Sequence, residues 1–252
     1  GQGTAGLEML SDQDDLDILL VPIGGGGLIG GIATIARDMR PDIKIIGVQT
    51  ALYPAMKQAV AGQDIACGGE TLAEGIAVKK PGAITQPVVA KYVDDVLLVD
   101  EQALEWAVGA LVEQQRVVSE GAGAAGIAAI YQHREIFAGK KVGVVICGGN
   151  IDPRLLASIL NRNMASDGRL ARLRIDISDE PGMLAAITAS ISRCGGNIVE
   201  IYHQRLFYDV PAKLAKIDAV IETRGPDHVT EIIDELRGAN FQVRQMDDYS
   251  GS

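Results

Sequence analysis

The sequence lacks the patterns that place a chain in a membrane, in a disulfide scaffold or around a structural metal ion. Its 252 residues include three cysteines and three histidines, and neither set has the short spacing of a metal site. Widely separated cysteines in odd number predict no disulfide framework. No apolar run approaches the roughly 18 residues of a membrane span, and no signal-peptide pattern opens the chain. We therefore expect a soluble, cytoplasmic protein.

The chain also has no cluster of basic residues. Its formal net charge is −10 at pH 7, which argues against nucleic acid or an anionic membrane as a partner. Hydrophobic residues make up 47% of the sequence, enough for a substantial core in one large domain or two. The expected ligands are therefore small molecules.

A run of four glycines, Gly24 to Gly27, follows an apolar strand pattern and precedes a helical pattern. Glycines allow unusual backbone conformations and bring N–H groups close to an anion. The positive end of the following helix adds to this attraction. The run therefore predicts a phosphate-binding loop, although tight packing of a glycine-rich helix start without any ligand stays open from the loop alone.

Two nucleotide-binding motifs compete for this loop. Residues 25–30 formally satisfy the dinucleotide fingerprint, but the next strand pattern ends in Gln49 and Thr50 where an acidic residue would hold the ribose. A Walker loop requires Lys-Ser or Lys-Thr after its last glycine, and neither follows here. NAD is therefore disfavoured and ATP more so.

Strand and helix patterns alternate over the first 150 residues or so. The strand patterns are continuously apolar, which is typical of a parallel sheet with both faces covered. This predicts an α/β domain. The strands are expected at 17–22, 44–49, 96–100 and 141–147, and the helices at 28–40, 53–61, 101–117 and 122–137.

The pattern changes after a helix that begins at Asp152-Pro153. The polar stretch 161–168 is the expected domain boundary. The order beyond it is βαββαβ, which predicts a ferredoxin-like α+β module of roughly 80 residues. Both of its helices carry one apolar face for a four-stranded sheet. The strands are expected at 172–177, 198–207, 216–223 and 240–245, and the helices at 183–194 and 227–237.

Four motifs give a resemblance to a known family. They are the glycine run at 24–28, AEGIAV at 73–78, SEGAGA at 119–124 and CGGNID at 147–152. In order and spacing they resemble threonine dehydratases (threonine ammonia-lyases), which are pyridoxal-phosphate (PLP) enzymes of fold type II, the tryptophan-synthase-β-like fold. The resemblance implies that residues 1–166 are the C-terminal part of the dehydratase domain.

The second module resembles an ACT domain, a regulatory unit that binds amino acids. The motifs are DEPGML at 179–184 and GGNI at 195–198. The expected ACT domain covers residues 169–248. Its implied effector site is the tight turn after the first strand, whose N–H groups would receive the effector carboxylate; a plain helix cap is the alternative interpretation. The candidate effector-binding residues are Asp179, Pro181, Gly182, Met183, Leu184 and Asn197.

The resemblance also implies a cofactor site. Cys147 matches the family's partner for the pyridine nitrogen, and a thiol there leaves that nitrogen neutral, which suits β-elimination. Glu120 matches a position near the cofactor ring and is a candidate catalytic residue. Glu70 and Glu74 match a site for a monovalent or divalent cation, although two acids in a loop are often only solvated. The candidate cofactor-binding residues are Gly24, Gly25, Gly26, Gly27, Leu28, Cys147 and Gly148.

The sequence departs from the family in one decisive way. The Schiff-base lysine of a Ser-x-Lys-x-Arg-Gly-Ala segment is absent, and no lysine of this chain matches that segment. Without this amine there is no covalent anchor and no base for elimination. The chain also opens at Gly1 without an initiator methionine. We therefore expect a fragment that is inactive alone.

The leading hypothesis is a PLP-dependent threonine ammonia-lyase that converts L-threonine to 2-oxobutanoate and ammonia. Amino-acid feedback through the ACT domain, a place in isoleucine biosynthesis and a homo-oligomer (dimer or tetramer) follow from the resemblance. One alternative is a non-catalytic amino-acid-binding regulatory subunit, and another is a serine dehydratase or racemase. A nicotinamide dehydrogenase carrying an ACT domain is disfavoured by Gln49 and Thr50 and by the CGGN segment.

Overall fold

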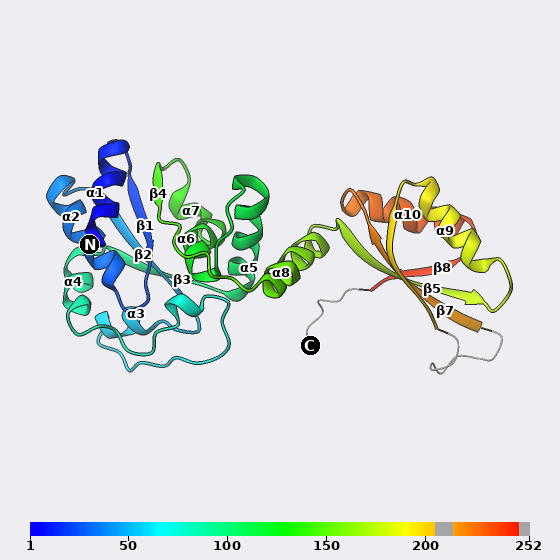
Figure 1. Cartoon of the computed structure of the whole chain (residues 1–252), viewed down its shortest axis with the longest axis horizontal. Helices are drawn as coiled ribbons and strands as arrows, with labels where there is room; N and C mark the ends of the chain where they lie inside the picture. Colours follow the sequence, from blue (N-terminus) through cyan, green and yellow to red (C-terminus); the bar gives the residue numbers. More distant parts are fainter. Residues whose placement is uncertain (205–213, 247–252) are drawn as a thin grey trace. The chain divides into compact units, whose positions relative to one another are not determined.

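The computed structural model describes residues 1–204 and 214–246. It divides into two compact units, Gly1–Ile159 and Leu160–Ser252 (Figure 1). No helix among the described residues combines the length and the apolar character needed to cross a membrane.

The first unit is built on a parallel four-stranded sheet with the strand order β3-β2-β1-β4 (Figure 1). Leu19 of β1 pairs with Ile45 of β2 on one side and with Gly143 of β4 on the other. The parallel sheet confirms the α/β class predicted for this part of the chain. The strands are β1 (Ile18–Pro22), β2 (Lys44–Thr50), β3 (Asp95–Val99) and β4 (Val142–Val144).

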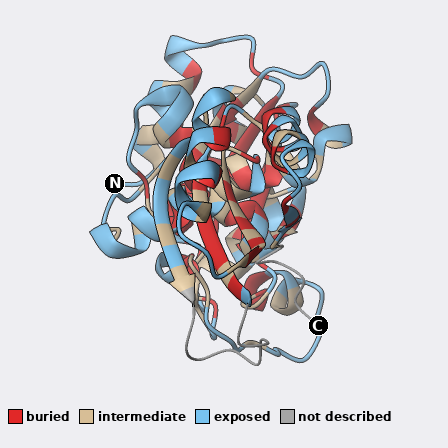
Figure 2. Cartoon of the chain, turned by 90° about the vertical axis from the view of Figure 1, so that its right-hand side faces the viewer, coloured by how far each residue is buried: buried red, intermediate tan, exposed pale blue. Residues whose placement is uncertain are grey.

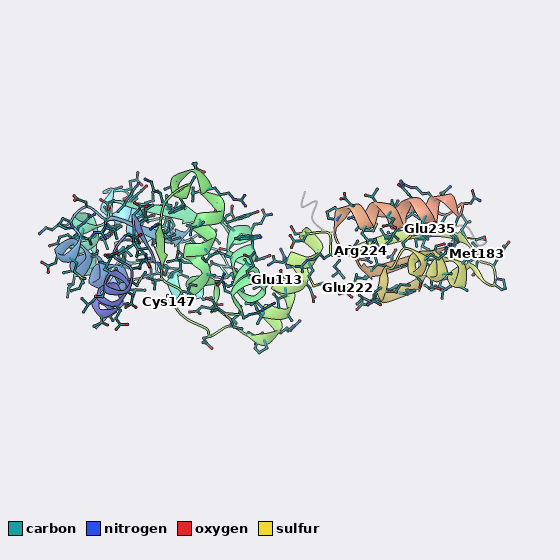
Figure 3. All side chains as sticks on the ribbon, turned by 90° about the horizontal axis from the view of Figure 1, so that it is seen from above. Glu113, Cys147, Met183, Glu222, Arg224 and Glu235 are labelled. Atoms are coloured by element: carbon teal, nitrogen blue, oxygen red, sulfur yellow. The ribbon has the colours of Figure 1, made fainter. Side chains whose placement is uncertain are left out.

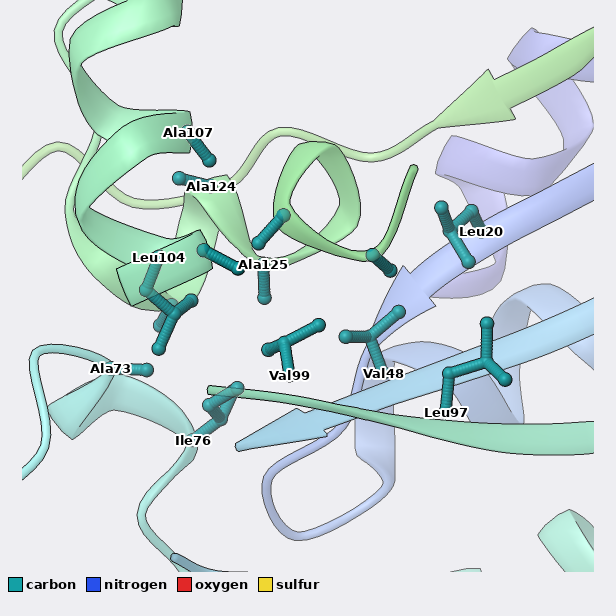
Figure 4. Packing of buried hydrophobic residues seen from close by; sticks show 14 of the residues in the cluster. Leu20, Val48, Ala73, Ile76, Leu97, Val99, Leu104, Ala107, Ala124 and Ala125 are labelled. Carbon is teal, nitrogen blue, oxygen red and sulfur yellow. The ribbon is translucent and has the colours of Figure 1, made fainter. Parts of the chain in front are cut away.

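Both faces of this sheet are covered, so neighbouring residues of one strand enter different cores. Leu20 belongs to the cluster shown in Figure 4, with side chains from α5 and α6. Leu19, one residue earlier, belongs to a second cluster that contains side chains of α1 and α2. Buried residues accordingly gather along the strands, and all five residues of β1 are buried (Figure 2). The helices of this unit are α1 (Gly3–Asp12), α2 (Gly27–Met39), α3 (Ala55–Val60), α4 (Thr85–Tyr92), α5 (Glu101–Ala110), α6 (Gly121–Gln132) and α7 (Arg134–Phe137). Helix α8 (Pro153–Ser166) begins in this unit and continues past its last residue, Ile159.

Several elements of the first unit differ from the prediction. Helix α4 has no counterpart among the predicted helices; it contains Pro87, which is tolerated because it lies in the first turn. The helix expected over 101–117 ends at Ala110 and continues as a π-helical turn, η2 (Leu111–Gln115). The helix expected over 122–137 is broken at His133, whose φ of −120° is not helical. The fourth strand ends at Val144, earlier than the sequence indicated.

The second unit is an antiparallel four-stranded sheet with the strand order β6-β7-β5-β8. Its element order is βαββαβ, as predicted. Residues 205–207 of the strand expected over 198–207, and residues 247–248 of the expected ACT domain, lie outside the described residues. The elements are β5 (Leu170–Ser178), α9 (Met183–Arg193), β6 (Asn197–Gln204), β7 (Leu214–Glu222), α10 (Pro226–Gly238) and β8 (Gln242–Gln245).

A buried carboxylate lies on the other side of this sheet from the aliphatic core. Asp218 of β7 has no exposed surface. Arg174 donates to both of its oxygens at 2.7 Å, and Arg172 donates to Oδ2 at 3.0 Å. The hydrogen bonds from Arg174 hold the pKa of Asp218 below its usual value, although burial acts in the opposite direction. The carboxylate is therefore charged and paired across the two central strands.

Candidate cofactor-binding site

The glycine run forms the turn between β1 and α2. Gly26 has φ of 89°, a left-handed conformation that favours glycine. The first bond of the helix joins the Gly30 N–H to the Gly26 carbonyl at 2.9 Å, so the preceding N–H groups have no helical acceptor. No acidic side chain lies in the first turn of α2. The loop therefore presents positive backbone dipoles that nothing in that turn neutralises.

This loop has an open side and a packed side. A Cβ added to Gly25 or Gly27 would meet no protein atom within 4 Å, whereas one added to Gly24 would lie 3.2 Å from the Gly75 carbonyl oxygen. Gly25 and Gly27 are also exposed. An anion thus has room beside the N–H groups, while the chain around Gly75 supports the loop from the other side. These features fit a phosphate group.

The segment that supports Gly24 is fixed by a hydrogen-bonded carboxylate. Glu101, at the start of α5, accepts from the Thr71 hydroxyl and from the Leu72 N–H, both at 2.7 Å. The buried Thr50 hydroxyl donates to the same carboxylate at 3.1 Å. This network fixes the chain just ahead of the short 3₁₀ turn η1 (Glu74–Ile76). Sequence reasoning missed Glu101, because its partners are about 30 and 50 residues away.

The third and fourth motifs meet at Glu120. Its N–H donates to the Gly148 carbonyl at 3.2 Å, and the Ser119 hydroxyl reaches the same oxygen at 3.2 Å. Gly148 has φ of 78°, and a Cβ there would collide with the Glu120 carboxylate. The same carboxylate lies 3.2 Å from the position of a Cβ on Gly75. Glu120 therefore links the second motif to the fourth.

Cys147 lies beside this carboxylate. It follows the end of β4 by three residues, so the strand expected over 141–147 ends before Cys147. Gly123 of α6 packs directly against the Cys147 carbonyl, with no room for a Cβ. Burial raises the pKa of the Cys147 thiol, and the negative charge of Glu120 raises it further. The thiol is therefore neutral at pH 7. Figure 3 labels its position.

The structure thus connects the four motifs, but it does not form a metal cluster around the acids expected to hold a cation. Glu70 and Glu74 are both exposed. In the described ranges 1–204 and 214–246, no group of three or more His, Cys, Asp or Glu side chains is arranged to hold a metal ion. The prediction of a cation site therefore rests on Glu70 and Glu74 alone.

The expected effector residues lie at two ends of α9. Gly182, with φ of 92°, precedes the helix, and Asp179 and Pro181 are exposed in the same turn. Asn197 follows the other end of the helix and donates to Glu222 at 3.0 Å. Figure 3 shows Met183 and Glu222 at opposite ends of this unit. Within one chain, Asn197 is therefore remote from the turn at Gly182.

Comparison with known proteins agrees with this geometry. A family model described as "Pyridoxal-phosphate dependent enzyme" matches residues 1–148. The L-threonine ammonia-lyase of Thermotoga maritima is 40% identical over 246 residues, covering 97% of this chain and 61% of the relative. The catabolic L-threonine dehydratase of Escherichia coli is 40% identical over 156 residues, covering 60% of this chain and 47% of the relative. The chain thus spans about three fifths or less of these relatives.

Solved structures show the same similarity in the fold. A threonine deaminase from the organism abbreviated T.th. is 32% identical with a TM-score of 0.57, covering 60% of this chain and 58% of that one. Maize serine racemase is 33% identical with a TM-score of 0.57, covering 64% of this chain and 52% of that one. These relatives and the family match favour PLP over a dinucleotide as the cofactor. Because the family model covers more than half of the residues, the chain belongs to the family of pyridoxal-phosphate dependent enzymes.

Proposed function

We propose that this chain is part of an L-threonine ammonia-lyase, which converts L-threonine to 2-oxobutanoate and ammonia. The observation that carries the proposal is the match to the Thermotoga maritima L-threonine ammonia-lyase, which extends over 97% of the chain and so through both units. The match to the Escherichia coli dehydratase covers only 60% of the chain. The contacts among the four motifs support the same interpretation of the first unit.

The chain's own residues bind and orient the cofactor in this proposal. Bound PLP supplies an electron sink that stabilises negative charge on the substrate during β-elimination. The N–H groups of Gly24 to Gly27 and the positive end of α2 bind the phosphate on the open side of the loop. Leu28, in the first turn of α2, adds the next N–H group. This fixes one end of the cofactor.

Cys147 and Glu120 act at the other end. The Cys147 thiol, whose pKa is raised, would form a hydrogen bond with the pyridine nitrogen of bound PLP and leave that nitrogen uncharged. Gly148 allows the close approach of Glu120, whose carboxylate would accept a proton near the cofactor ring. A neutral nitrogen weakens the electron sink, which disfavours transamination relative to elimination.

We further propose that the 252-residue chain alone does not anchor PLP covalently. No lysine of the chain lies in a segment like the Schiff-base segment of the family. Lys57 also donates to the Val96 carbonyl, and Lys141 pairs with Asp15. The test is borohydride reduction in the presence of PLP, followed by peptide mapping. One lysine labelled in stoichiometric amount would contradict this proposal.

For the second unit, we propose an ACT domain over residues 169–248 that senses a branched-chain amino acid, isoleucine or valine first. The turn at Gly182 presents N–H groups to the effector carboxylate. Two copies pair along a sheet edge, which places Asn197 of one copy beside the other copy's turn. The βαββαβ order supports this assignment. Titration calorimetry of the whole chain against the twenty amino acids tests it, with Gly182→Asp as the variant expected to lose binding.

The activity itself is tested with the full-length protein. The proposal predicts 2-oxobutanoate from L-threonine with a higher kcat/KM than pyruvate from L-serine. A serine racemase or dehydratase is the second candidate, because maize serine racemase matches as well as the T.th. threonine deaminase does. Formation of D-serine, or a clear preference for L-serine, would favour that candidate.

A further inference from the structure

The glycine loop accepts hydrogen bonds from a segment some 60 residues later in the sequence. The Gly25 carbonyl accepts a hydrogen bond from the Thr85 hydroxyl. The Gly82 N–H points to the same oxygen at 3.3 Å. Thr85 is the first residue of α4, and its neighbour Ile84 is 84% exposed. Both donors therefore come from one turn that lies against the loop.

The packing around this hydroxyl is close. A Cβ on Gly82 would lie 2.6 Å from Thr85 Oγ1, and a Cβ on Gly26 would lie 2.9 Å from the Thr85 Cβ. Gly82 is not among the glycines with positive φ. A side chain at this position would therefore push against Thr85 and the Gly25 carbonyl.

The bond to Gly25 determines where the next N–H points. In a trans peptide unit the C=O and the following N–H point in opposite directions. With the Gly25 carbonyl turned toward Thr85, the Gly26 N–H points away from Thr85. This leaves the Gly26 N–H, and not the Gly25 carbonyl, available to an anion on the side of the loop away from Thr85.

We propose that Thr85 is a positioning residue for the cofactor phosphate: its hydroxyl holds the Gly25 carbonyl so that the Gly26 N–H faces the anion. The part that concerns the cofactor rests on the proposed function of the loop. The part that concerns loop geometry does not. Thr85 contacts the loop backbone only and takes no part in the reaction.

The test compares Thr85→Val with Thr85→Ser in the 252-residue chain. Valine keeps the shape and removes the hydroxyl, whereas serine keeps the hydroxyl. Amide hydrogen exchange at Gly82 and Gly30, whose N–H groups donate to the Gly25 and Gly26 carbonyls, reports the order of the loop without any cofactor when it is followed by NMR. We expect exchange to become about tenfold faster in Thr85→Val and to stay near wild type in Thr85→Ser. Gly82→Ala, which pushes the hydroxyl away, should act like Thr85→Val.

The matched control is Thr34→Val. Thr34 donates to the Gly30 carbonyl at 2.8 Å within α2, so this variant makes the same chemical change in the helix that follows the loop. We expect it to leave loop exchange unchanged. Unchanged exchange in Thr85→Val would overturn the positioning role, as would equal losses in Thr85→Ser and Thr85→Val.

Titration with PLP, followed by the chemical shifts of the Gly26, Gly27 and Leu28 amides, separates this proposal from the proposed function. We expect wild type and Thr85→Ser to bind PLP alike and Thr85→Val to bind about tenfold more weakly. If Thr85→Val loosens the loop but PLP shifts other amides only, the positioning role stands and the phosphate assignment fails. If PLP binds the loop equally in all three proteins, the hydroxyl does not position the phosphate.

Discussion

The central strands of the two units are buried in different patterns. Every residue of β1 is buried, whereas β5 alternates strictly between buried and half-buried residues. The first pattern belongs to a parallel sheet covered on both faces, and the second to an antiparallel sheet with one aliphatic face. Strand β1 therefore has no side chain left for a ligand. The chemistry of the first unit must come from the loops at the strand ends, where the four motifs indeed meet.

The largest effect should come from placing a polar group in β1. We expect Leu19→Asn and Leu20→Asn each to lower the free energy of unfolding by about 3 to 4 kcal/mol, because adjacent residues enter separate cores. In β5, Ile175→Asn should be similarly costly, but its neighbour Asp176→Asn should change stability by less than about 0.5 kcal/mol. Urea unfolding measures all four. A small loss in the free energy of unfolding for either β1 variant would contradict the proposed difference between β1 and β5.

The next effect concerns cofactor retention by the first unit. Gly26→Asp should lower PLP affinity of the full-length protein by about a hundredfold or more, because the carboxylate repels the phosphate. Its Cβ would also lie 2.6 Å from Met56 and 2.9 Å from Thr85 in a left-handed conformation. PLP content after dialysis is the measurement. Gly62→Asp, also at a positive φ but with open space around it, is the control; equal loss in both variants would argue against a phosphate at the loop.

In the second unit, the charged side of the sheet makes stability depend on pH. The pKa of Asp218 is lowered in the folded state, mainly by the hydrogen bonds from Arg174. Its contribution is therefore present above the unfolded pKa of about 3.9 and is lost as the pH falls through the folded value. At pH 7, Asp218→Asn should cost about 2 kcal/mol. Asp176→Asn, at an ion pair of 4.0 Å to Lys216, should cost far less. A wild type whose acid unfolding matched that of Asp218→Asn would contradict this.

The smallest effect is expected at Cys147. Cys147→Ser should keep lyase activity of the full-length protein within about tenfold, because either group forms a hydrogen bond with a neutral pyridine nitrogen. Cys147→Asp should reduce elimination more, because a carboxylate keeps that nitrogen protonated. Steady-state kinetics with L-threonine distinguishes the two. Equal losses would mean that Cys147 has a packing role.

The sequence predicted what depends on periodicity and on local motifs. The continuous apolar strands indicated the parallel sheet, and the helical spacings beyond Met183 indicated the two helices of the second unit. The glycine run predicted the turn at Gly26. Helix α4 was not predicted, and Pro87 within it weakens the helical pattern, because a proline normally argues against a helix. The contacts of Glu101 and Thr85 could not be predicted from the sequence, because they join residues that only the fold brings together.

Each unit is assigned one ligand, and hydrogen exchange by mass spectrometry on the whole chain tests this directly. PLP should slow exchange in peptides that cover residues 24–28 and 147–149 and leave residues 179–184 unchanged. Isoleucine or valine should slow exchange in residues 179–184 and leave residues 24–28 and 147–149 unchanged. Protection of the second unit by PLP, or protection of neither motif region of the first unit at saturating PLP, would contradict the assignment.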